Sequence, residues 1–125
     1  MLEEIESMLR KHGATYPYFG TYPDQVRERV LVAGLIANGV RHLMKDERSI
    51  AAVDAAIAFG LGKIELDELR QAALNAHEAA YDYKTAYIPS IADASNAAAH
   101  AAYSAIAPDA AAFAYASAIK ALKKT

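Results

Sequence analysis

The alanine-rich stretch SNAAAHAAYSAIAPDAAAFAYASAIKALKK, residues 95–124, determines most of what can be expected of this chain's architecture. Alanine is the best helix former, because it loses no side-chain entropy when the backbone becomes ordered. Pro108 interrupts the run and suits the first turn of a helix, so the stretch predicts two helices that meet at this proline. Alanine faces let helix axes approach closely, so these helices should pack tightly.

The remainder of the chain also has the pattern of helices, and no strand-like alternation competes with it. Asp46 is a suitable N-cap, and the two glycines of FGLGK, residues 59–63, suit a helix end rather than a phosphate loop. The expected helices cover about 2–12, a long segment from Pro23 to Met44, a segment from Asp46 to FGLGK, and then about 65–86, 89–106 and 108–123. The prediction is an all-α protein, a compact bundle of five to six helices that forms a single domain over residues 1–125.

The composition excludes several classes of function. The 125 residues carry 13 basic and 15 acidic side chains, a net charge of −2, so no basic surface for nucleic acid is expected. No cysteine is present, which removes disulfides and thiolate chemistry. The start MLEEIESMLRKH is acidic and amphipathic, unlike a secretory signal, and the alanine-rich run is too interrupted to span a membrane. A cytoplasmic protein is expected.

The segment near 89–106 places several polar side chains on one side of a helix. At about 100° per residue, Asp93, Asn96, His100, Tyr103 and Ser104 share one arc of about 100°. This arc has two interpretations. It is either a solvated helix face or part of a partner surface or pocket wall, since Tyr and His combine an apolar body with a polar tip.

His77 lies in NAHEAAYDYK, which resembles the start of a zinc-protease motif but has Tyr81 where the second histidine would stand. Two imidazoles therefore cannot converge on a metal from this helix alone. A site that combines His77 with His42 and His100 stays geometrically open, although unrelated histidines are the expected case. No metal ligand or cofactor is assigned.

The segment TYPYFGTYP, residues 15–23, concentrates four aromatic side chains, namely Tyr16, Tyr18, Phe19 and Tyr22. These rings either fill the end of a bundle whose alanines are too small to do so, or form an exposed hot spot for a protein partner. No serine–histidine–acid spacing, dinucleotide fingerprint or calcium loop occurs anywhere in the chain. An enzyme is not expected.

Residues 47–80, ERSIAAVDAAIAFGLGKIELDELRQAALNAHEAA, followed by the alanine-rich pair at 96–124, resemble the Imm-five-like immunity proteins of bacteria and their phages. The resemblance covers about residues 41–123, and His100 matches a histidine often found there. It implies a small all-helical protein that protects a cell from a toxin by binding it, with no catalytic residues.

The expected function is therefore that of a non-enzymatic binding protein, an immunity or anti-toxin factor that neutralises a protein partner by occlusion. The alternative is a helical protein that binds a small ligand or a metal, such as a phage factor that sequesters a signalling molecule. An alanine face left over after bundle closure also leaves a homodimer open. The candidate binding residues are Tyr16, Tyr18, Phe19, Tyr22, His77, Asp93, Asn96, His100 and Tyr103.

Overall fold

The computed structural model describes residues 26–85, 89–107 and 109–123, and its regular structure is entirely helical. The elements are α2 (Val26–Asn38), the 3-10 helix η2 (Arg41–Leu43), α3 (Glu47–Gly60), α4 (Leu66–Thr85), α5 (Pro89–Tyr103) and α6 (Asp109–Lys123). The prediction of an all-α bundle with alanine-rich C-terminal helices is confirmed. The helix expected at 2–12 and the aromatic segment 15–23 lie outside the described residues.

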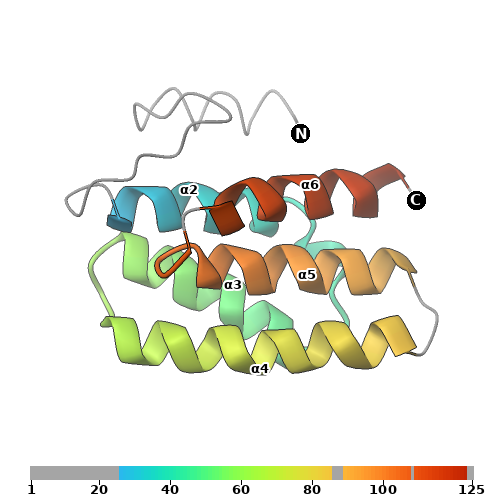
Figure 1. Ribbon diagram of the computed structural model, residues 1–125, viewed down its shortest axis with the longest axis horizontal. Helices are drawn as coiled ribbons and strands as arrows, with labels where there is room; N and C mark the ends of the chain where they lie inside the picture. Colours follow the sequence, from blue (N-terminus) through green and yellow to red (C-terminus); the bar gives the residue numbers. More distant parts are fainter. Residues whose placement is uncertain (1–25, 86–88, 108, 124–125) are drawn as a thin grey trace.

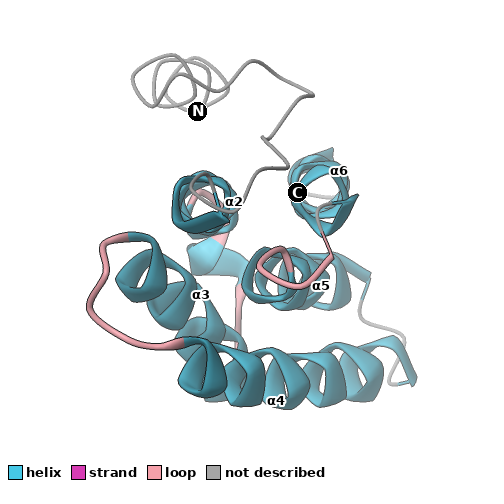
Figure 2. Cartoon of the chain, turned by 60° about the vertical axis from the view of Figure 1, so that its left-hand side comes forward, coloured by secondary structure: helices cyan, strands magenta, loops and turns pink. Residues whose placement is uncertain are grey.

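The α-helices form two packed layers (Figures 1 and 2). Helices α4, α5 and α6 form one layer, in which neighbouring helices run in opposite directions. Helices α2 and α3 form the second layer and pack against one face of the first. Helix α5 contacts each of the other four α-helices. Among the described residues, the four neighbouring helices therefore leave one side of α5 uncovered.

The central position of α5 explains its composition. Its fully or nearly fully buried side chains are small: Ala92, Ala94, Ser95, Ala97, Ala98, Ala99, Ala101 and Ala102. Larger apolar side chains from α2, including Val30 and Ile36, fill the remaining core. The buried Ser95 hydroxyl is paired with that of Ser49 on α3 at 3.0 Å, so neither polar group is left unsatisfied.

The long helix expected from Pro23 to Met44 ends earlier in the structure. Helix α2 ends at Asn38, the chain turns through Gly39, and Met44 is extended with φ −82° and ψ 129°. Glycine is a poor helix former, and the chain must reverse direction here before α3 can pack on α2. The predicted N-cap is confirmed, because the Asp46 carboxylate accepts a hydrogen bond from the Arg48 N–H at 2.8 Å.

The end of α3 confirms the helix stop predicted from FGLGK. Gly62 has φ +79°, its N–H donates to the Phe59 carbonyl at 3.0 Å, and the Lys63 N–H donates to the Ala58 carbonyl at 2.8 Å. This is the Schellman arrangement, which favours glycine at the left-handed position. Gly60 has a different role: a Cβ there would lie 2.7 Å from the Leu31 Cα, so its absence allows α2 and α3 to approach closely.

Two arginines of α2 tie distant segments together. Arg27 donates to the Phe59 carbonyl at 2.6 Å and lies over the Phe59 ring, with its guanidinium carbon 4.4 Å from the ring centroid. Arg29 is buried, with 3% of its surface exposed, and its Nε donates to the Ser104 carbonyl at 2.8 Å. Burial lowers the pKa of the Arg29 guanidinium. Because Ser104 follows the last residue of α5, Arg29 fixes the end of α5 against α2.

Candidate functional site

Two histidines that are 23 positions apart in the chain meet between α4 and α5. The His77 and His100 ring centroids lie 5.8 Å apart, with the ring planes at 89°. The Tyr103 ring packs edge-on against His77 at 5.3 Å, and the Phe113 ring of α6 lies 5.5 Å from His100. His77, His100, Tyr103 and Phe113 are called the imidazole–aromatic cluster below.

The cluster forms because α5 has one uncovered side. Asp93, Asn96, His100 and Tyr103 are the partly exposed residues on it, as the helical arc predicted. The prediction was wrong for Ser104, which is fully buried and whose Oγ donates to the Ala101 carbonyl at 2.7 Å. The reason is that α5 ends at Tyr103. Ser104 lies beyond the helix, so the rotation of about 100° per residue does not predict the direction of its side chain.

Large apolar side chains are exposed within the cluster and beside it on α4. Phe113 is 56% exposed, and on α4 Leu74 and Tyr81 are 48% and 67% exposed. Leu74, His77 and Tyr81 follow one another at spacings of three and four residues, so they share one side of α4. Together with the cluster they make up what is called here the outer face of the α4–α5–α6 layer: Leu74, His77, Tyr81, His100, Tyr103 and Phe113.

Both imidazoles of the cluster favour the neutral form. Burial lowers the pKa of His77. Burial also lowers the pKa of His100, and repulsion from a charged His77 lowers it further. Within the described ranges, neither imidazole is hydrogen-bonded to another side chain or to the backbone, and their contacts are with rings. Each neutral ring keeps one nitrogen lone pair that can accept a proton, a hydrogen bond or a metal ion.

The remaining predicted residues have different positions. Asn96 and Asp93 lie four and seven residues before His100, on the same side of α5. His42 is exposed on η2 and makes no ring contact with His77 or His100. Across the residues that the structure describes, no three or more His, Cys, Asp or Glu side chains are grouped to hold a metal ion, so the three-histidine arrangement is not formed there. Tyr16, Tyr18, Phe19 and Tyr22 lie outside these residues.

Sequence reasoning missed Phe113 and the meeting of His77 with His100. The only local signal for Phe113 was a large aromatic residue in a run of alanines. It also missed the role of Arg48, whose guanidinium lies 2.7 Å from Asp46 and 2.9 Å from Asp82 on α4. The hydrogen bond from Arg48 lowers the pKa of Asp46. This network joins the start of α3 to α4.

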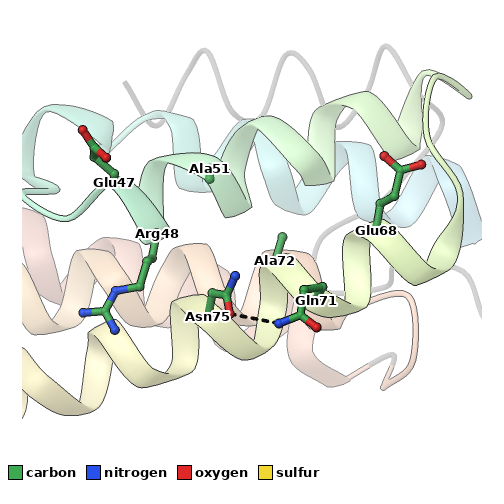
Figure 3. A pocket seen from close by; sticks show the side chains of 7 residues that line it. All are labelled: Glu47, Arg48, Ala51, Glu68, Gln71, Ala72 and Asn75. Carbon is green, nitrogen blue, oxygen red and sulfur yellow. Dashed lines mark hydrogen bonds between the residues drawn. The ribbon is translucent and has the colours of Figure 1, made fainter.

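A separate open groove of about 570 Å³ lies between α3 and α4 (Figure 3). Ala51 and Ala72 provide its small apolar side chains, one from each helix. Gln71 donates to the Asn75 side-chain carbonyl at 3.0 Å, and Glu68 adds a carboxylate near one end. The surface that lines the groove is mostly apolar, and its charged side chains, Glu47, Arg48 and Glu68, carry both signs.

Comparison with known proteins identifies no family. No family model matches the chain, and no curated protein or solved structure shows a significant match. The resemblance to the Imm-five-like immunity proteins stays a prediction. No helix in the described ranges is both long and apolar enough to cross a membrane.

Proposed function

We propose that this chain is a non-enzymatic binding protein that neutralises a protein partner by occlusion, and that the outer face of the α4–α5–α6 layer is its binding surface. The observation that supports this proposal is the exposure of Phe113 in the cluster and of Leu74 and Tyr81 beside it on α4. Large exposed apolar side chains that gather on one face mark interaction sites, and aromatic residues are enriched in the centres of interfaces.

The packing of the cluster also suits a binding surface. His77 and Tyr103 contact each other edge-on, and His100 is held between His77 and Phe113. Side chains that neighbours already restrain lose less conformational entropy when a partner binds, so more of the contact energy contributes to affinity. Asp93 and Asn96, which precede His100 on the same side of α5, provide polar groups for the rim of such an interface.

The class of partner follows from the resemblance stated above. Immunity proteins act by covering a toxin, which requires a rigid surface and no catalytic residues. A toxin encoded beside this chain is the first partner to test. If the proposal is correct, the purified chain binds that toxin and relieves its toxicity when the two are expressed together.

The surface is tested by the double variant Tyr81→Ala/Phe113→Ala, measured by calorimetric titration with the toxin. Both side chains are exposed, so the free energy of unfolding should change by no more than about 0.5 kcal/mol per site. Binding should weaken by about 2 kcal/mol or more, the loss typical of hot-spot truncation. Leu61→Ala removes an equally exposed apolar side chain outside the outer face and is the matched control. If Leu61→Ala weakens toxin binding as much as the double variant does, the outer face is not the binding surface.

The groove between α3 and α4 favours a second candidate function, the binding of a small molecule. Its volume of about 570 Å³ is within the range of ligand pockets, about 300–1,000 Å³. Native mass spectrometry of the purified chain should then show a retained ligand, which Ala72→Leu in the groove should displace. A ligand-free mass for the wild-type chain, unchanged by added cell extract, would remove this candidate.

A further inference from the structure

The His77–His100 pair has the dimensions of a metal-binding site. A transition-metal ion lies about 2.0–2.1 Å from each imidazole nitrogen that binds it. With about 1.2 Å more from nitrogen to ring centre, two imidazoles on one ion have centroids about 4.5 Å apart at adjacent positions of a square-planar ion, about 5.2 Å apart at a tetrahedral angle and about 6.4 Å apart when they lie on opposite sides of the ion. The observed separation of 5.8 Å lies between these limits.

The neighbouring rings pack against the two histidines, but no hydrogen bond within the described residues prevents them from turning toward a shared ion. The torsion that rotates a histidine ring is broad, with no sharply defined minimum. No hydrogen bond within the described residues fixes either ring, so turning a nitrogen of each toward the space between them breaks no such bond. The two ligands come from different helices, α4 and α5, which pack directly on each other. The backbone therefore holds the pair together before any ion arrives.

We propose that His77 and His100 form a two-imidazole site for a divalent first-row transition-metal ion, with copper(II) bound most tightly and solvent completing the coordination. Imidazole nitrogen is a preferred ligand of copper, nickel and zinc, and copper(II) heads the order of affinities for such donors. The inference does not depend on the proposed protein partner.

The surroundings of the pair favour binding near neutral pH. Protons compete with metal ions for the imidazole nitrogen, so a ligand must be neutral. Burial already favours the neutral form of both rings, through the pKa directions given above. The rings of Phe113 and Tyr103 pack against one part of the pair, and because both histidines are partly exposed, water can reach the ion from the open side.

The test is calorimetric titration of the untagged full chain at pH 7.5 with copper(II) supplied as its glycine complex, which keeps the ion in solution and whose own stability is subtracted. We expect one copper(II) ion per chain, weaker binding of nickel(II) and zinc(II), and an electron paramagnetic resonance spectrum that shows coupling to two imidazole nitrogens. His77→Gln and His100→Gln should each weaken binding by at least about tenfold, since the loss of an outer-shell partner alone costs about that much. Circular dichroism establishes that each variant is folded.

The matched control is the double variant His12→Gln/His42→Gln, which removes the other two histidines and leaves the pair intact. It should bind copper(II) like the wild-type chain. The proposal is overturned if the titration of the wild-type chain shows no binding of copper(II). It is equally overturned if the control variant loses as much affinity as the His77 and His100 variants.

Discussion

Arg29 shows how much one residue can contribute to this bundle. A buried arginine is rare unless it is paired, because removing a charge from water is costly. Here the guanidinium reaches the Ser104 carbonyl at 2.8 Å, at a helix end where carbonyl groups have no partner within the helix. A cation is also favoured at this end by the helix dipole. Arg29 thus serves α5 as a C-terminal cap supplied by another helix.

Replacing Arg29 with methionine should therefore destabilise the protein. The substitution keeps much of the apolar stem but leaves the Ser104 carbonyl without its donor, which should cost about 1–3 kcal/mol of unfolding free energy. Urea denaturation at 25 °C measures this loss. Arg70→Met, at an exposed position of α4, is the control and should change stability by no more than about 0.5 kcal/mol. A loss of equal size in both variants would mean that Arg29 does not act through the Ser104 carbonyl.

At the scale of elements, the contact between α4 and α5 should make stability depend on pH. The unfolded chain binds protons at its histidines near pH 6.5, whereas folding lowers the pKa of His77 and of His100. Between the folded and unfolded pKa values the unfolded state binds more protons, so stability rises with pH. The full contribution is present above about pH 6.5 and is lost as the pH falls below it.

The urea concentration at the unfolding midpoint should accordingly decrease as the pH is lowered from 7 to 5. The double variant His77→Gln/His100→Gln should show a shallower dependence over the same range, because neither glutamine titrates. Asp46 does not interfere, since its pKa lies below the ordinary value of 3.8 and its effect appears only in more acidic solution. A midpoint that depends on pH equally in the wild-type chain and the double variant would contradict this assignment.

At the scale of the whole molecule, α5 connects all the other α-helices through small side chains. Ala98 is fully buried at its centre, so Ala98→Leu adds volume where no space exists. Such overpacking costs about 1–3 kcal/mol. Because the described residues share one core, unfolding followed by circular dichroism and by tyrosine fluorescence should give one common, lowered midpoint.

The exposed alanine of α6, Ala116, provides the control for this prediction. Ala116→Leu makes the same chemical change on the surface and should alter stability by no more than about 0.5 kcal/mol. Two separate transitions in Ala98→Leu, one for each probe, would show that the helices do not unfold as one unit.

Much of this architecture could be predicted from local features. The N-cap at Asp46, the glycine stop at Gly62 and the two alanine-rich helices on either side of residue 108 all depend on residues close together in the chain. The early end of α2 was not predicted, because it reflects the need of α3 to pack back on α2. The same limit applies to Ser104, whose burial depends on where α5 stops.

The sequence by itself determined that the described segments are helical, where most of these helices begin and end, and which side of α5 carries Asp93, Asn96, His100 and Tyr103. Helical periodicity is a local property, and it is visible in a single chain segment. Only the tertiary structure decided that His100 meets His77 and Phe113, because these residues lie on three helices whose rotation and register follow from side-chain packing. The candidate site forms only when α4, α5 and α6 pack together, because each of these helices contributes at least one of its rings.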